Sequence, residues 1–206
     1  MSEAQNEPAQ AAAAEENKEE EIKEEQKEEV KDDRPVVTLT GVTSYVGAYV
    51  AKHFLADETY KVRATVRAKN NAAKMQPLKE ALGDEDYDKL ELIEADILEE
   101  ANMNEAIKGS TFVVHMASPF VFTSNTENLV EPVEAGIKSL MKACKEHKVK
   151  RCVMTSDIAA IQNVAADDKP EDNTFDESKW SNPDRAESLD NYLKAKIKAE
   201  KTAWDF

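Results

Sequence analysis

The chain has 206 residues, with 42 acidic and 27 basic side chains, so its formal net charge is −15. An acidic chain repels phosphate backbones, which argues against nucleic-acid binding. No stretch approaches about 18 consecutive apolar residues, so we expect no transmembrane helix and no membrane partner. The charge is unevenly distributed: residues 1–34 hold 13 acids and 5 bases. The remaining 172 residues are mildly acidic and long enough to form one sizeable hydrophobic core.

Residues 1–34 are dominated by Ala, Glu, Lys and Gln. Such a segment buries too little apolar surface to offset its ordering entropy, so we predict an acidic tail that is disordered or transiently helical. It either docks a protein partner or acts as a solubilising extension. It lacks the apolar run of a signal peptide. Cys144 and Cys152 lack metal or redox spacing, so we expect buried free thiols in a cytoplasmic protein.

From residue 35 onward, β-branched runs alternate with helical apolar periodicity. In chain order we predict a strand at 36–40, a helix at 45–55, a strand at 61–66, a helix at 70–82 with Pro77 as a possible kink, a strand at 90–95, a short helix at 103–107 stopped at Gly109, a strand at 111–116, a helix at 128–147, a strand at 150–155, a long loop at 165–183 and a helix at 189–206. This alternation predicts an α/β fold, with a doubly wound, Rossmann-type parallel sheet spanning residues 35–206.

The first predicted strand runs directly into a glycine-containing turn. Gly41, Ser44 and Gly47 stand at the three positions of a dinucleotide-binding fingerprint, with serine in the middle position. There the glycines allow a tight turn, a close approach to a diphosphate, and close helix–strand packing. A side chain at Ser44 would crowd a diphosphate, so we expect Ser44→Gly to tighten binding. The alternative is an ordinary strand-to-helix turn.

A basic residue follows the second predicted strand. Nucleotide folds place an acid there for the ribose 2′-hydroxyl of NAD, whereas an arginine accommodates the 2′-phosphate of NADP. Arg67 stands at this position, with Lys69 and Lys74 close behind it. The pattern therefore favours NADP(H) as cofactor, against the alternative of a solvated surface arginine.

Tyr192 and Lys196 lie four residues apart on the last predicted helix, so they share one face. A cationic lysine stabilises a nearby phenolate, which suits a tyrosine that acts as general acid on a carbonyl oxygen. Such a pair also occurs by chance. His115 ends the fourth predicted strand, where we expect a packed histidine, and no His, Cys, Asp or Glu cluster has metal-ligand spacing.

Six segments carry a resemblance to a known family: residues 60–67, 94–97, 105–109, 114–119, 176–181 and 192–196. On these segments the chain from Val36 to Phe206 resembles the dihydroflavonol reductase-like branch of the extended short-chain dehydrogenase/reductases, in the NAD-dependent epimerase/dehydratase superfamily. That branch includes cinnamoyl-CoA reductases and aldehyde reductases. The resemblance implies an NADP-dependent oxidoreductase that reduces a small carbonyl compound to an alcohol.

The resemblance also implies a role for individual positions. The diphosphate would be lined by Gly41, Ser44, Tyr45, Val46 and Gly47, the 2′-phosphate by Arg67 and Lys74, the adenine by Asp96 and Ile97, and the nicotinamide ribose by Ala117 and Ser118. Tyr192 would be the proton donor, and Lys196 would bind the ribose hydroxyls and lower the tyrosine pKa.

Three features depart from the family pattern. Ser44 replaces the middle glycine, and Asp157 stands where the family has its catalytic serine. An ionised carboxylate can only accept hydrogen bonds, so Ser156 is the alternative catalytic hydroxyl, although neighbouring strand side chains point to opposite faces. Finally, the family continues past Phe206 into a substrate region. Three interpretations stay open: a reductase, a catalytically degenerate nucleotide-binding or partner-docking module, and a truncated gene product.

Overall fold

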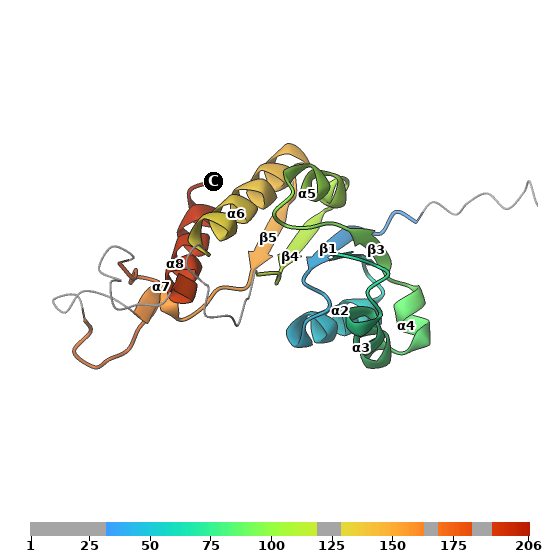
Figure 1. Ribbon diagram of the computed structural model, residues 1–206, viewed down its shortest axis with the longest axis horizontal. Coiled ribbons are helices and arrows are strands. Elements are labelled where there is room, and N and C mark those ends of the chain that lie inside the picture. Colours follow the sequence, from blue (N-terminus) through green and yellow to red (C-terminus); the bar gives the residue numbers. More distant parts are fainter. Residues whose placement is uncertain (1–31, 119–128, 163–168, 183–190) are drawn as a thin grey trace, which may run out of the picture. The chain divides into compact units, whose positions relative to one another are not determined.

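The computed structural model describes residues 32–118, 129–162, 169–182 and 191–206. Nearly all of the predicted acidic tail therefore lies outside the described residues. Residues 34–206 form one compact unit. Its elements, labelled in Figure 1, are β1 (Val36–Thr40), α2 (Tyr45–Asp57), β2 (Lys61–Val66), α3 (Ala72–Leu82), α4 (Asp84–Asp88), β3 (Glu91–Glu94), α5 (Glu100–Ile107), β4 (Phe112–His115), α6 (Val130–Glu146), β5 (Arg151–Met154), α7 (Ala159–Gln162) and α8 (Asn191–Trp204).

The five strands form one parallel sheet in the order β3-β2-β1-β4-β5. This confirms the predicted Rossmann-type fold. β1 lies at the centre, with Leu39 paired to Ala64 of β2 on one side and to Val114 of β4 on the other. The chain winds outward from β1 in both directions, so the crevice between the carboxyl ends of β1 and β4 is the topological switch point at which such sheets bind ligands.

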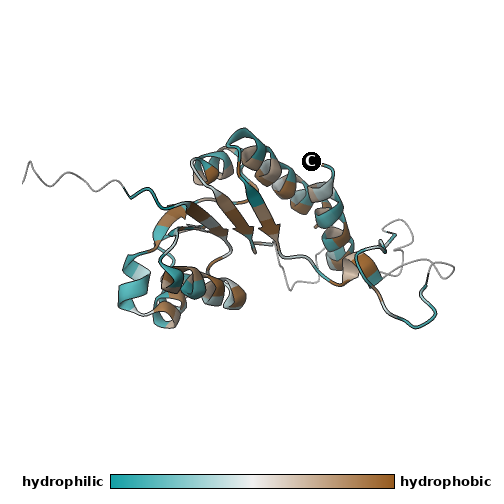
Figure 2. Ribbon diagram, turned by 180° about the vertical axis from the view of Figure 1, so that it is seen from behind, coloured by the Kyte–Doolittle hydropathy of each residue, from teal (hydrophilic) through white to brown (hydrophobic). Residues whose placement is uncertain are grey.

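Alternate residues of the strands face two separate cores. On β1, Val37 and Leu39 are fully buried in a cluster with α2 and α3. Val113 of β4 instead packs in a second cluster with α5 and α6. Figure 1 shows α2 and α3 on one side of the sheet and α5 and α6 on the other, and Figure 2 shows that the strands between them are largely hydrophobic. The period of two along each strand therefore places helices on both faces.

The boundaries differ from the sequence prediction at several element ends. β3, β4 and β5 are each one residue shorter at both ends than predicted, and α5 begins at Glu100, three residues early. α4 and α7 were not predicted, because helices of five and four residues are too short to show a periodic pattern. Within the described residues 169–182 there is no helix or strand, in agreement with the predicted loop.

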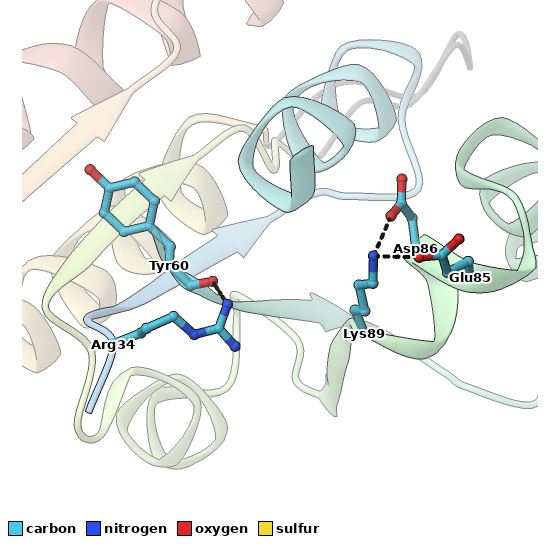
Figure 3. A network of polar contacts seen from close by, with 5 residues as sticks. All are labelled: Arg34, Tyr60, Glu85, Asp86 and Lys89. Atoms are coloured by element: carbon cyan, nitrogen blue, oxygen red, sulfur yellow. Dashed lines mark hydrogen bonds and ion pairs between the residues drawn. The ribbon is translucent and has the colours of Figure 1, made fainter. Parts of the chain in front are cut away.

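Polar contacts precede both β2 and β3, as Figure 3 shows. The Arg34 guanidinium donates to the carbonyls of Glu58, at 2.9 Å, and Tyr60, at 3.3 Å. These bonds tie the segment before β1 to the segment before β2. Just before β3, the Lys89 ammonium contacts the carboxylates of Glu85 and Asp86, and these hydrogen bonds raise the pKa of Lys89.

Candidate functional site

The turn after β1 is shaped by two glycines. Gly41 has φ of +75°, a conformation that favours glycine, and a Cβ there would lie 2.7 Å from the backbone nitrogen of Ala117. A Cβ on Gly47 would lie 2.2 Å from the carbonyl oxygen of Gly41. The helix therefore packs against the turn, and the turn against the end of β4, more closely than any side chain would permit. Neither Gly41 nor Gly47 could carry a Cβ without a clash against backbone atoms.

Ser44 is the N-cap of α2. Its hydroxyl donates to the Gly41 carbonyl at 2.8 Å and accepts from the Gly47 N–H at 3.0 Å. The N–H groups of Tyr45 and Val46, in the same first turn, have no helical carbonyl to bond, so they face outward with the positive end of the helix dipole. From the sequence, Ser44 was expected only as a replaced glycine; a serine just before a helical pattern is the signal that would have identified the cap.

Beside this turn, a pocket of about 330 Å³ is lined by Thr43, Val66, Arg67, Ala68, Asn71 and Lys74. The structure thus brings together the two cations that the sequence analysis assigned to a 2′-phosphate. Arg67 and Lys74 are exposed, and neither is ion-paired with a carboxylate in the part of the chain that the structure describes. An anionic group entering this pocket would meet two cations without displacing an internal partner.

Asp96 and Ile97 follow the carboxyl end of β3. The Asp96 carboxylate accepts from the Leu98 N–H at 3.0 Å, and the Asp96 carbonyl accepts from the Glu99 N–H at 3.0 Å. Asp96 therefore shapes the turn that leads into α5. Ile97 lines a second pocket, which also contains Ala117 and Ser118, so three of the residues expected around the nucleotide lie near one another.

The second pocket is small, about 20 Å³, and lies beyond the carboxyl ends of β4 and β5. Its lining comprises Ile97, His115, Ala117, Ser118, Val133, Ile137, Met154, Thr155, Ser156, Lys196 and Ala199. Lys196 reaches it from α8. Burial lowers the pKa of Lys196, while the nearby Asp157 carboxylate acts in the opposite direction. The predicted lysine is therefore a partly desolvated cation at the wall of this pocket.

The predicted acid, Tyr192, lies next to the residue that replaces the family serine. Its phenol donates to the Asp157 carboxylate, with an O–O distance of 3.2 Å. The Lys196 ammonium lies 5.6 Å from the centroid of the Tyr192 ring. Because a carboxylate can only accept, Asp157 binds the phenol proton that a reductase donates to its substrate. The Tyr–Lys pair is present, but its proton is engaged.

Ser156 has a different partner. Its hydroxyl contacts the carboxylate of Glu200 on α8, two helical turns beyond Tyr192. Neighbouring side chains point to opposite faces only within a strand, so Ser156 could substitute for the serine only if the strand ended early. β5 ends at Met154, and both Ser156 and Asp157 contact α8. The Asp157 carboxylate also accepts from the Ala159 N–H at 2.9 Å, which begins α7.

His115 is buried, as the sequence analysis expected of a packed histidine, but it also lines the second pocket. Its Nδ1 lies 2.8 Å from the Thr40 hydroxyl oxygen. Burial lowers its pKa to about 4, and the charge of Lys196 acts in the same direction. The ring is therefore neutral at physiological pH. Its place at the pocket was missed, because a strand position shows only that a side chain faces a core.

Cys144 is a buried free thiol and Cys152 a partly buried one. Among the described residues, no group of three or more His, Cys, Asp and Glu side chains could hold a metal ion. Within the same ranges, no helix has the length and apolar character needed to cross a membrane.

The chain is similar to a known family and to two of its enzymes. The chain matches a family model described as NAD(P)H-binding over residues 41–203. It is 36% identical over 177 residues to a dihydroflavonol 4-reductase of Hordeum vulgare, covering 82% of this chain and 48% of that protein. It is 34% identical over 171 residues to a cinnamoyl-CoA reductase 1 of Petunia hybrida, covering 82% of this chain and 49% of that protein.

Two solved structures are similar over most of the chain. Vestitone reductase from alfalfa superposes with a TM-score of 0.66 at 30% identity, covering 83% of this chain and 52% of that one. Gre2 from Candida albicans in complex with NADPH superposes with a TM-score of 0.67 at 26% identity, covering 84% and 52%. The chain thus spans about half the length of these four relatives.

Proposed function

Because this chain belongs to the NAD(P)H-binding, dihydroflavonol reductase-like branch of the extended short-chain dehydrogenase/reductases, we propose that it binds NADP(H) in preference to NAD(H). One observation carries the choice: Arg67 and Lys74 line a single pocket beside the glycine turn, and neither has a carboxylate partner among the described residues. Charge-assisted hydrogen bonds from such cations suit a 2′-phosphate. The similar Gre2 structure contains NADPH.

The residues along the carboxyl edge of the sheet fit the rest of the nucleotide. The outward N–H groups of Tyr45 and Val46 would receive the diphosphate at the start of α2. Gly41 and Gly47 keep that turn compact. Asp96 and Ile97 would flank the adenine, and Ala117, Ser118 and Lys196 would hold the nicotinamide ribose. These roles are supported by the second pocket, whose lining includes Ile97, Ala117, Ser118 and Lys196.

The reaction we propose for the complete protein is the reduction of a small carbonyl compound to an alcohol. The cofactor supplies the hydride when bound. Tyr192 donates its phenolic proton to the carbonyl oxygen, and the Lys196 ammonium favours the phenolate that remains. Ser156 carries the hydroxyl next to Asp157, which stands at the position of the family's catalytic serine. To donate to the substrate oxygen, this hydroxyl would have to break its hydrogen bond to Glu200.

A second function is favoured by the bond between Tyr192 and Asp157. That bond directs the proton of the proposed acid toward a carboxylate, and a carboxylate opposes the negative charge that develops on a substrate oxygen. The alternative is therefore a nucleotide-binding module without turnover, for which the acidic segment 1–34 would serve a protein partner. A cytoplasmic location belongs to the same proposal.

Titration calorimetry with NADPH and NADH tests the proposed cofactor. Each charge-assisted contact to phosphate is worth about 1.5–3 kcal/mol, so NADPH should bind at least about tenfold more tightly. Arg67→Ala should remove most of this preference. Lys69→Ala is the matched control, because it deletes a neighbouring exposed cation that does not line the pocket. Equal affinity for the two nucleotides, or an Arg67→Ala variant with unchanged preference, would contradict the assignment.

A further inference from the structure

A buried polar group lies beneath the crevice between β1 and β4. The hydroxyl oxygen of Thr40 is 2.8 Å from Nδ1 of His115 and accepts from the backbone N–H groups of Met116 and Ala117, each at 3.2 Å. Thr40 immediately precedes Gly41, and the backbone nitrogen of Ala117 would lie 2.7 Å from a Cβ on Gly41. One hydroxyl therefore ties the end of β1 to the end of β4.

These contacts determine the tautomer of His115. The Thr40 oxygen has two lone pairs and one hydrogen, and the two backbone N–H groups occupy the lone pairs. Its own hydrogen is then donated to His115 Nδ1, which must be the unprotonated ring nitrogen. The low pKa of the ring, about 4, keeps it neutral at physiological pH. The remaining hydrogen of His115 is therefore carried by Nε2.

The Nε2–H group is a donor without a partner in the described structure. His115 is only 2% exposed, and Nδ1 is its one ring nitrogen with a hydrogen-bond partner in the described residues. The ring lines the second pocket together with Lys196, Thr155 and Ser118. Nε2 is not among the fully buried side-chain atoms of the described residues that lack a partner, and the ring lines the pocket, so this donor is available to an acceptor that enters the pocket.

We propose that His115 is a binding residue for the nicotinamide-ribose half of the nucleotide. Its Nε2–H donates to an uncharged oxygen, a hydroxyl or a carboxamide carbonyl, on the side of the pocket that Lys196 also faces. The fixed Thr40 bond holds the ring so that this donor keeps its direction. The inference rests on the proposed function, since it assigns one more contact to the same nucleotide.

A pair of variants separates the two nitrogens. His115→Asn keeps an amide oxygen near the position of Nδ1 to accept from Thr40, but has no donor at Nε2. His115→Gln carries its amide to the Nε2 position and can restore the donor. Each is titrated with NADPH and with adenosine 2′,5′-bisphosphate, which contains the 2′-phosphate but no nicotinamide ribose. The melting temperature of each variant is measured in parallel.

Loss of one neutral hydrogen bond should weaken NADPH binding to His115→Asn by about fivefold to tenfold. Affinity for the bisphosphate should stay unchanged, and His115→Gln should recover much of the NADPH affinity. Equal NADPH affinity in wild type and His115→Asn, or equal losses for both ligands, would overturn the inference while leaving the cofactor assignment intact. A wild-type chain that binds neither ligand would refute the proposed function, and this inference with it.

A measurement on the unaltered chain covers the case in which the variants do not fold. The side-chain resonances of His115 are followed by NMR as each ligand is added. We expect the Nε2–H signal to shift with NADPH and to stay in place with the bisphosphate. A His115 ring that responds to neither ligand, while NADPH binds, would refute the contact.

Discussion

Replacing Asp157 by serine tests whether this residue suppresses carbonyl reduction. In the structure the Asp157 carboxylate accepts the phenol proton of Tyr192 across 3.2 Å. The same phenol must donate to the substrate oxygen if Tyr192 is the acid. Asp157→Ser removes the charge, frees that proton and returns a hydroxyl that can itself donate. The substitution therefore removes one obstacle to NADPH-dependent reduction, but we expect that alone it does not restore measurable turnover in this chain, which spans about half the length of the relatives it matches.

The size of the effect follows from two contributions. Loss of one oxyanion donor costs about 10²–10³ in rate. In addition, a substrate oxygen hydrogen-bonded to Tyr192 would carry its developing charge close to Asp157, and like charges about 4 Å apart repel by about 1 kcal/mol in bulk water and about 4 kcal/mol near a protein surface. Asp157 is partly buried, so the value near a protein surface is the closer guide. Together the two contributions predict that aspartate at this position costs at least about 10² in kcat/KM.

The assay follows NADPH absorbance with a panel of aldehydes and ketones, for the wild-type chain and for Asp157→Ser. Tyr192→Phe combined with Asp157→Ser is the control, since it removes the acid and keeps the new serine. The reciprocal change is made in the Hordeum vulgare dihydroflavonol 4-reductase, where aspartate is placed at the position that matches residue 157. This second arm reads the effect of the carboxylate in a protein with its own substrate.

We expect no measurable turnover from the wild-type chain and a loss of about 10²–10³ in the reciprocal variant. Robust turnover by the unaltered chain, abolished by Tyr192→Phe, would show that Asp157 is compatible with catalysis. So would a reciprocal variant that keeps full activity. Either result would refute the argument from charge.

Two further predictions concern the glycine turn. Ser44→Gly should tighten NADPH, because it removes a side chain beside the diphosphate and frees the Gly47 N–H that the serine now holds, while loss of the cap to glycine costs only a few tenths of a kcal/mol; if calorimetry shows weaker binding instead, the serine is itself a ligand. Gly47→Ala should destabilise the fold by about 1–3 kcal/mol or more in chemical denaturation and weaken NADPH, because its Cβ would meet the Gly41 carbonyl at 2.2 Å. Gly109→Ala is the control: its φ of +75° strains an alanine and lowers stability, but nothing lies within 4 Å of that Cβ, so the change does not touch the glycine turn, and equal NADPH losses in both variants would contradict the role of close packing.

The fold could be predicted from the sequence because the patterns that determine its strands and helices are local. Each strand is a short apolar, β-branched run, and each long helix repeats its buried residues at helical spacing, as Val133, Ile137, Leu140 and Cys144 do on α6. Local patterns of this kind fix the order of strands and helices, and parallel pairing then follows from the crossover rule. The glycine turn was equally readable, since the spacing of Gly41 and Gly47 follows directly from the geometry of a strand entering a helix.

The tertiary structure decided which polar groups meet. Asp157 and Tyr192 are 35 residues apart, and Thr40 and His115 are separated by 75. No periodicity relates such positions, because Thr40 meets His115 through the pairing of β1 with β4, and Asp157 meets Tyr192 through the end of β5 and the packing of α8 against α6 and α7. The sequence by itself determined a nucleotide-binding sheet with a Tyr–Lys pair; only the folded arrangement showed that the Tyr192 phenol donates to Asp157, since hydrogen bonds form between atoms that packing brings within about 3 Å, whatever their separation along the chain.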